Sequence, residues 1–411
     1  MKRLLFFLAA CLFVVSLNSC EGDSPIVVGE NPYEPLGLTS EQEIMVNTGN
    51  QFALKLLAAV DAEAEGNYII SPLGLQFTLG MLLEGANGQT AQEICEVLGF
   101  RKDNVASVNE FYGRLIRELP TLDKLTDIIS CRTVLTAPTL NLKEDYVSSV
   151  SESYQAHFEQ VDFSKTAAAR NVINNWCSKN TNGMIREMVS EKEESYLKSV
   201  RAMFLDALWF KGLWMDKFNK KTSSKDIFTR EDGTKETVVY MKKTADFNAS
   251  ILGTHGSVSI PYGNGAYSMV VCLPNEGEST QDAIQRMIET GHIPQLGYPG
   301  NPTELWLPRF ELEYEANYER VLDKMGMPSA FSALAEFSKM SDEGLTIDRL
   351  RQKSAIKIDE DGTEAAAVTQ AVMLATGAPS ILQLYVNRPF LFFVTEKSTG
   401  AILFSGAYKG I

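Results

Sequence analysis

The chain has 411 residues, of which 45% are hydrophobic and 22% charged, and its formal net charge is −14 at pH 7. This composition supports a large buried core and excludes an intrinsically disordered chain. The acidic balance excludes nucleic-acid binding, because phosphate contacts need clustered Lys and Arg and the densest basic run, residues 217–225, is interrupted. The length alone suggests two or three domains, but no repeat, low-complexity tract or linker divides the chain after residue 39.

The N-terminus has the pattern of an export signal. Lys2 and Arg3 precede an apolar run over residues 4–17, which is too short to span a bilayer comfortably. The following Asn-Ser-Cys resembles a bacterial lipobox, which predicts a signal peptide over residues 1–19 and lipidation of Cys20. Acyl chains on Cys20 would hold the protein at an outer membrane or cell surface. The alternative is an ordinary signal peptide and a secreted protein.

Residues 20–38 contain three prolines and three glycines with little apolar pattern, which predicts a solvated tether. The folded domain is expected over residues 39–411. Apolar spacing there predicts seven helices, over residues 41–59, 73–84, 91–98, 142–155, 167–178, 282–289 and 318–324. Strand-like runs cover residues 128–135, 201–210, 237–241, 257–260, 268–273, 304–312, 354–359, 384–385, 390–395 and 401–408. Interleaved helices and strands favour an α+β fold.

The cysteines do not indicate a metal or redox site. Cys11 would leave with the signal peptide, and the remaining four are widely separated without a C-x-x-C motif: Cys95, Cys131, Cys177 and Cys272. Cys131 and Cys272 lie in apolar strand-like runs and are predicted to be buried thiols. A disulfide in an exported protein is the alternative.

Catalysis is not expected. The chain has no G-x-S-x-G, H-E-x-x-H or Gly-rich phosphate motif, and its three histidines are far from one another in sequence: His157, His255 and His292. We therefore predict a protein that is not an enzyme and needs no cofactor or metal. A passive surface lipoprotein that binds a ligand remains an alternative without a specific supporting motif.

The most informative segment is residues 354–369, where a strand-like run leads into three acidic residues, Gly362 and then small residues. At a period of two, one face carries Thr363, Ala365, Ala367 and Thr369. This face is small and uncharged, so it can be buried without an unpaired charge. Alanine is a poor strand former, so the segment suits either a loop or a buried strand. A surface helix is the simpler alternative.

This segment resembles the hinge of the reactive-centre loop in the serpin family. The matching residues are Glu360, Gly362, Thr363, Glu364, Ala365, Ala366, Ala367, Val368 and Thr369. Four further segments resemble serpin signatures in family order, at residues 67–73, 207–214, 305–312 and 387–406. The resemblance covers roughly residues 39–411.

The resemblance implies a fold of three β-sheets and eight to nine helices with an exposed reactive-centre loop. It also implies a monomeric suicide inhibitor whose partner is a target protease. The protease cuts the loop, and the hinge inserts into the main sheet before the covalent intermediate is hydrolysed. Insertion needs small inward residues and no proline, and no proline occurs between residue 354 and Pro379. A non-inhibitory serpin is the alternative reading.

Family spacing from Glu360 places the reactive bond at Thr376–Gly377, within a window from Ala375 to Ala378. The window contains no Arg, Lys, Phe or Tyr, which favours elastase-like or subtilisin-like serine proteases over trypsin-like ones. Papain-like cysteine proteases remain possible targets.

The resemblance also implies a sheet-opening region, formed here by Ser71, Asp206, Trp214, Arg309 and Gln352. Arg309 is expected to pair with Glu360 at the top of the main sheet. Two of these residues depart from the family pattern, because Asp206 stands where Asn is usual and Gln352 where His is usual. We therefore expect a buried Asp206–Gln352 hydrogen bond, with further donors from Ser71. Gly74 also replaces a usual serine.

Overall fold

The computed structural model describes residues 31–252, 255–294, 296, 302–347, 349–362 and 381–410. The α-helices are α1 (Ser40–Asp61), α2 (Pro72–Gly85), α3 (Gly88–Leu98), α4 (Val105–Glu118), α5 (Glu144–Tyr154), α6 (Thr166–Asn180), α7 (Thr280–Thr290) and α8 (Glu319–Met325). The strands are β1 (Tyr68–Ile70), β2 (Thr126–Thr136), β3 (Ala156–Gln160), β4 (Ala202–Gly212), β5 (Ser224–Thr229), β6 (Lys235–Ala245), β7 (Asn248–Leu252), β8 (His255–Pro261), β9 (Tyr267–Leu273), β10 (Thr303–Pro308), β11 (Phe310–Asn317), β12 (Arg351–Ile358), β13 (Leu382–Tyr385), β14 (Phe390–Glu396) and β15 (Ile402–Tyr408).

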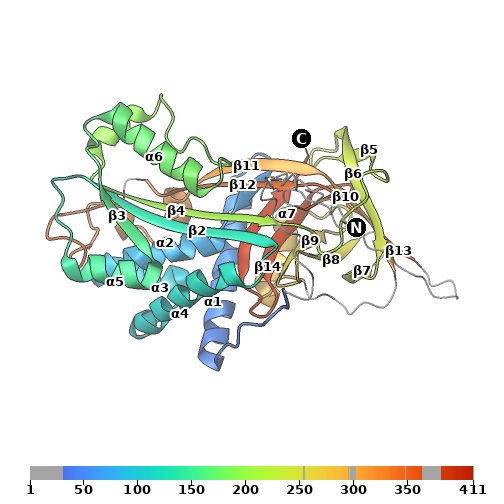
Figure 1. The fold of residues 1–411 in the computed structure, drawn as a ribbon, viewed down its shortest axis with the longest axis horizontal. Helices are drawn as coiled ribbons and strands as arrows, with labels where there is room; N and C mark the ends of the chain where they lie inside the picture. The colour runs from blue at the N-terminus through green and yellow to red at the C-terminus, as the bar shows by residue number, and fades with distance from the viewer. Residues whose placement is uncertain are drawn as a thin grey trace, which may run out of the picture.

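The predicted α+β fold is confirmed, and all seven predicted helices are present (Figure 1). The sequence patterns missed α4 and the shorter strands β1, β3, β5 and β7. The prediction of one strand over residues 304–312 is wrong. The chain changes sheets at Arg309, because β10 pairs with β6 while β11 pairs with β12. Pro308 has no N–H group to continue the ladder, which suits a strand end.

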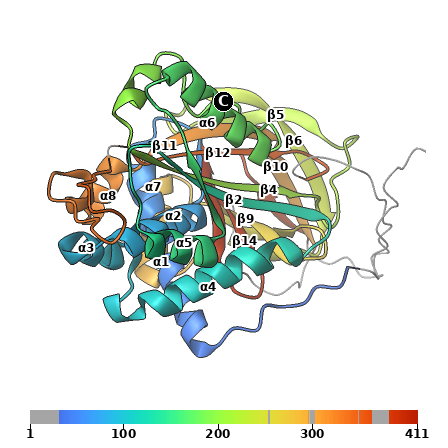
Figure 2. The ribbon, with the colours of Figure 1, turned by 60° about the vertical axis from the view of Figure 1, so that its left-hand side comes forward.

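The segment before α1 is bound to the body of the protein, so the predicted solvated tether does not extend through residues 31–38. The Asn31 amide donates to Asp123 at 2.6 Å, and the backbone N–H of Leu36 donates to Ser398 at 3.0 Å. Arg114 of α4 donates to the carbonyl of Gly37. Figure 2 shows this segment running along the outside of the molecule past α4 before α1 begins. The rest of the predicted tether, and the predicted signal peptide, lie outside the described residues.

The described strands form four hydrogen-bonded sheets, of which two are halves of one main sheet, so the arrangement agrees with the three sheets expected. One sheet has the order β1-β15-β14-β9-β8-β7, and a second has the order β13-β10-β6-β5. The other two, β3-β2-β4 and β11-β12, are the two halves of the main sheet. They count separately because no ladder joins β4 to β12 among the described residues. We call the strand position between β4 and β12 the slot.

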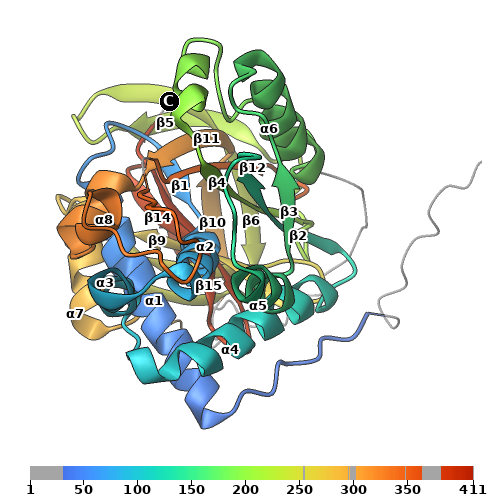
Figure 3. The same ribbon diagram turned by 90° about the vertical axis from the view of Figure 1, so that its left-hand side faces the viewer.

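The main sheet is covered on both faces. Helix α6 lies on one side of its long strands, and α1, α2, α4 and α5 lie on the other (Figures 1 and 3). A small apolar cluster under α6 includes Ile173 and Leu205, whereas the large core lies on the opposite side. Helix α2 is buried along almost its whole length, and β14 and β15 are buried throughout. The main sheet therefore lies against well-packed elements of the large core.

Within the described residues, no helix is long and apolar enough to cross a membrane. Cys95, Cys131, Cys177 and Cys272 are free thiols, so the disulfide alternative is wrong for these four. Cys272 is buried as predicted, whereas Cys131 is only partly buried. Cys11 and Cys20 lie outside the described residues.

Candidate functional site

The end of β12 forms a tight turn over residues 359–362, which we call the hinge turn. Asp359 and Gly362 exchange backbone hydrogen bonds of 3.0 and 3.2 Å, and Gly362 forms an antiparallel bridge with Leu213 just beyond β4. Gly362 has a φ of 127°, and a Cβ there would lie 2.3 Å from the carbonyl oxygen of Gly212. Only glycine fits this position. The turn therefore places the start of the predicted loop at the top of the slot.

Trp214 holds the hinge turn from one side. Its indole Nε1 donates to the carbonyl of Asp359 at 2.8 Å, and its backbone N–H donates to the carbonyl of Asp361 at 3.1 Å. The indole is buried and stacks on Tyr262 with 4.4 Å between ring centroids. The residue expected from the family signature thus contacts the hinge turn directly.

The structure brings Arg309 and Glu360 together as expected. Arg309 Nη1 lies 3.6 Å from Glu360 Oε2, within ion-pair distance but too long for a strong hydrogen bond. The Glu360 side chain is 3% exposed, and its other oxygen accepts a hydrogen bond of 2.7 Å from the Ser223 hydroxyl. Arg309 is 48% exposed, so water screens this pair on one side.

Two lysines that sequence reasoning missed bind the next residue of the turn. Lys217 Nζ lies 3.2 Å from Asp361 Oδ1, and Lys220 Nζ pairs with Asp361 Oδ2. Burial raises the pKa of Asp361, but hydrogen bonds from Lys220 and Lys217 outweigh it and leave the pKa below its usual value. Both charged runs were visible in the sequence, the basic run over residues 217–225 and the acidic run over residues 359–361. Local sequence patterns could not predict that they pair, because the two runs are far apart along the chain.

The expected hydrogen bond between Asp206 and Gln352 is wrong. Gln352 instead pairs with the backbone of Ser71, the N-cap of α2: its Oε1 accepts from Ser71 N–H at 2.7 Å and its Nε2 donates to Ser71 C=O at 3.0 Å. The hydroxyl of Tyr318 donates to the same Oε1 at 2.9 Å. The Ser71 hydroxyl donates to the carbonyl of Leu403 rather than to Asp206. The Gln352 amide is thus satisfied without the carboxylate.

Asp206 pairs with Arg132, its neighbour across the β2–β4 ladder. The Asp206 Oδ1 and Arg132 Nε atoms are 3.0 Å apart, and the two side chains are 6% and 0% exposed. Arg132 also donates to the carbonyl of Tyr154 and lies over the ring of Phe77, 4.6 Å from its centroid. Burial raises the pKa of Asp206 to about 6 despite the opposing effect of Arg132. An arginine inside an apolar strand was the sequence signal for this buried pair.

Gly74 is explained by the same carboxylate. A Cβ on residue 74 would lie 2.5 Å from Asp206 Oδ2, 3.2 Å from the Ser71 hydroxyl and 3.3 Å from Gln352 Nε2. A serine at this position would therefore collide with Asp206. The two departures from the family pattern, at residues 74 and 206, compensate each other.

The remaining expected site residues lie outside the described residues. They are the reactive-bond residues Ala375, Thr376, Gly377 and Ala378 and the hinge residues Thr363, Glu364, Ala365, Ala366, Ala367, Val368 and Thr369. Their roles stay predictions from the sequence.

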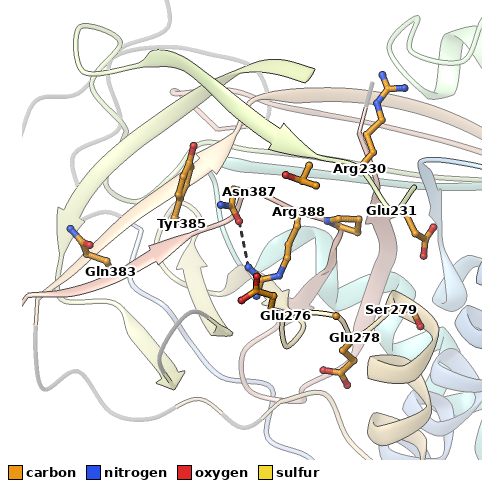
Figure 4. Close-up of a pocket in the computed structure, with 12 residues that line it drawn as sticks. Arg230, Glu231, Glu276, Glu278, Ser279, Gln383, Tyr385, Asn387 and Arg388 are labelled. Atoms are coloured by element: carbon orange, nitrogen blue, oxygen red, sulfur yellow. Dashed lines mark hydrogen bonds between the residues drawn. The ribbon is translucent and has the colours of Figure 1, made fainter. Parts of the chain in front are cut away.

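A cavity of about 670 Å³ lies remote from the slot. It lies between residues 229–231, 276–279 and 383–389, and Figure 4 shows its lining side chains. Four of its charged groups are engaged within the protein: Arg230 pairs with Glu236, Glu278 pairs with Arg286, Arg388 donates to the carbonyl of Pro274, and Glu231 pairs with Lys409. Arg388 of the C-terminal signature therefore has a structural role here. No metal-binding cluster of His, Cys, Asp or Glu occurs among the described residues.

A family model described as serpin (serine protease inhibitor) matches residues 47–409. The chain therefore belongs to the serpin family. It is 30% identical over 390 residues to plasminogen activator inhibitor 1 of Bos taurus, covering 92% of this chain and 94% of that protein. It is also 30% identical over 369 residues to serpin B13 of Homo sapiens, covering 84% and 94%.

Solved serpin structures share the fold. Tengpin, a thermophilic serpin in its native state, matches with a TM-score of 0.79 at 24% identity, over 93% of this chain and 97% of that one. Serpin48 of Tenebrio molitor matches with a TM-score of 0.78 at 25% identity, over 91% and 100%. The family is one of protease inhibitors rather than enzymes, and its partner is a target protease.

Proposed function

We propose that this protein is an irreversible suicide-substrate inhibitor of serine proteases with elastase-like or subtilisin-like specificity. The protease serine attacks the carbonyl carbon of residue 376, an ester forms, and the amide to Gly377 breaks as its nitrogen takes a proton. The freed hinge then enters the slot as a new strand. The bound protease is carried away and distorted before water can cleave the ester.

The observation that carries this proposal is the slot with the hinge turn at its top. Strands β4 and β12 share no ladder among the described residues, yet the antiparallel bridge between Gly362 and Leu213 already starts one. A strand that continued from Gly362 would gain backbone hydrogen bonds along β4. Such bonds, together with burial of the strand, supply the free energy that insertion needs.

The register of that bridge agrees with the predicted inward face. If the antiparallel pairing of Gly362 with Leu213 continued, residue 369, seven positions after Gly362, would face Asp206, seven positions before Leu213. Directly opposed residues of an antiparallel pair point to the same side of a sheet. Asp206 points beneath the sheet toward Gly74, so Thr363, Ala365, Ala367 and Thr369 would be buried. These are the small residues on which the sequence prediction rests.

The far end of the slot offers room for the end of the inserted strand. A cavity of about 330 Å³ lies there between residues 199–204 and residues 344–350, with Met203, Phe204 and Leu350 among its lining. In the same register, residue 373, eleven positions after Gly362, would lie opposite Ala202, eleven positions before Leu213. Met373, which would face inward in this register, could contact the apolar part of this lining, which also contains polar residues such as Arg201 and Thr346.

The lack of cationic or aromatic residues around Thr376 favours proteases with small, apolar primary pockets. Papain-like cysteine proteases are a further candidate class. We also propose that the protein is exported, acts as a monomer and is anchored by a lipid on Cys20, on the basis of its N-terminal sequence. Free secretion is the alternative location.

The direct test is to mix the purified protein with pancreatic elastase and, separately, with subtilisin. A covalent complex that survives boiling in detergent is expected, with the protease mass increased by that of the cleaved inhibitor. Mass spectrometry of the released C-terminal peptide would locate the bond at Thr376–Gly377. Loop cleavage without a complex for any protease of a broad panel would instead establish a non-inhibitory serpin.

A further inference from the structure

The hinge turn contains three consecutive carboxylates, on Asp359, Glu360 and Asp361. The Glu360 and Asp361 side chains are only 3% and 12% exposed, so solvent screens their mutual repulsion poorly. The Asp359 carboxylate accepts a hydrogen bond of 2.9 Å from the Asp361 backbone, which draws the three groups into one tight turn. This turn needs nearby positive charge to remain folded.

The chain between β4 and β5, residues 213–223, supplies most of that charge. Lys217 reaches Asp361 Oδ1 with its own side chain 12% exposed, and Lys220 reaches Asp361 Oδ2 from a 64% exposed position. The same segment binds the turn through its backbone, since Phe218 N–H donates to the carbonyl of Glu360 at 2.9 Å. The two lysines therefore belong to a segment fitted to the turn, not to a freely moving surface loop.

Lys217 is itself fixed from behind. Lys243 of β6 donates to the backbone carbonyls of Asp216 and Lys217 at 2.5 and 3.2 Å. Its ammonium also forms an ion pair with the Asp216 carboxylate at 2.5 Å. Lys243 thereby neutralises the carboxylate of Asp216, the neighbour of Lys217 in sequence. The charge of Lys217 is left directed at Asp361.

We propose that Lys217 and Lys220 are positioning residues for loop insertion, which hold the hinge turn closed so that residue 363 continues antiparallel to β4. This inference rests on the proposed inhibitory function and deepens it. Insertion competes with hydrolysis of the covalent intermediate, so a turn that is already folded shortens the delay before insertion begins. Without the lysines, the carboxylates repel one another and the turn opens, so more intermediate is hydrolysed before the protease is trapped.

The test compares the double variant Lys217→Met/Lys220→Met with a matched control, Lys221→Met. Lys221 has the same charge and lies on the same segment, but the described residues contain no ion pair for it. Two quantities are measured with elastase: the rate of loop attack, and the number of inhibitor molecules consumed per trapped protease. The double variant should leave the rate of attack unchanged and raise the number consumed roughly two- to fivefold, the range that partly exposed ion pairs support.

Two further variants separate positioning from a general effect on folding. Asp361→Asn removes both ion pairs but also one of the repelling carboxylates, so it should raise the consumed number less than the lysine variant does. Combined with the lysine changes, it should lower the consumed number towards that of Asp361→Asn alone. Lys217→Arg should retain most of the wild-type value. Added salt should raise the wild-type number, because it screens the ion pairs. It should lower the number of the double variant, because it screens the remaining repulsion among the carboxylates. An unchanged number in the double variant, or additive effects of Asp361→Asn and the lysine changes, would overturn the inference.

A readout without a trapped protease keeps this inference separate from the proposed function. After limited cleavage of the loop, the rate at which the cleaved protein becomes resistant to heat reports insertion alone. The lysine variant should gain resistance more slowly than wild type and Lys221→Met. If the cleaved loop of the wild type inserts but no protease forms a complex, the proposed inhibitory function is wrong. The comparison of insertion rates still tests the role of the lysines in that case. Equal rates in all three proteins would refute that role.

Discussion

Gly74 on α2 and Asp206 on β4 lie so close that one methyl group on residue 74 would stand 2.5 Å from Asp206 Oδ2. Real Cβ contacts do not occur at that distance. A side chain on residue 74 is therefore incompatible with the observed position of the Asp206 carboxylate. The pair lies beneath the main sheet next to the slot, where the proposed mechanism requires the sheet to open. The identity of residue 74 is therefore a consequence of the carboxylate on residue 206.

Replacement Gly74→Ala should destabilise the uncleaved protein by about 1–3 kcal/mol, the usual cost of overpacking a tight core. Helix propensity alone would have the opposite sign and favour alanine by roughly 1 kcal/mol. In an Asp206→Ala background the same replacement should cost much less. Urea unfolding of the four proteins of this cycle measures the coupling, and equal costs in both backgrounds would rule it out.

Replacement Arg132→Leu should destabilise the uncleaved protein by about 3–5 kcal/mol, because it leaves the Asp206 carboxylate buried without its partner. The double replacement Arg132→Leu/Asp206→Leu should recover most of this loss, since both charges are then absent. Lys211→Met, which also removes one positive charge from a strand of the main sheet, serves as a comparison. A double variant no more stable than Arg132→Leu would contradict the pairing.

Asp206 should make stability depend on pH near 6. Burial raises its folded pKa to about 6, above the ordinary value of 3.8, so between these values the folded protein binds a proton that the unfolded chain releases. The contribution of this group to stability is therefore greatest below about pH 4 and is lost as the pH rises through 6. Urea unfolding between pH 4.5 and 7.5 should show wild type gaining stability relative to Asp206→Asn as the pH falls. A constant difference between the two proteins would exclude this titration.

Replacement Thr363→Arg should convert the inhibitor into a substrate. On the inward face of an inserted strand, the arginine would be buried without a partner at a cost of several kcal/mol, so insertion would stall while cleavage continued. Ala366→Arg is the matched control, because by the period of two residue 366 would lie on the opposite face of the inserted strand. Detergent-stable complex should disappear for Thr363→Arg and persist for Ala366→Arg. Equal complex formation by both would remove the case for insertion in this register.

The periodicity of the sequence was sufficient to predict most helices and most strands, with α4 the missed helix. Helix α1 and strands β14 and β15 carry dense apolar patterns that report their burial directly. The pattern failed at Arg309, where one predicted strand became two, because a change of sheet leaves no trace in local alternation. The bound segment over residues 31–38 was also missed, since single hydrogen bonds such as that of Asn31 to Asp123 produce no periodic signal.

The local sequence by itself was sufficient to predict the position of the hinge. Only glycine tolerates the backbone of residue 362, and the alternating small residues after it can be recognised without coordinates. The tertiary structure alone decided which charges meet: Arg132 rather than Gln352 for Asp206, and Lys217 together with Lys220 for Asp361. A side chain's conformational limits depend on its immediate neighbours in sequence, whereas its ionic partner depends on strand register and burial. Lys217 and Asp361 are separated by 144 positions, and only the folded main sheet brings them together.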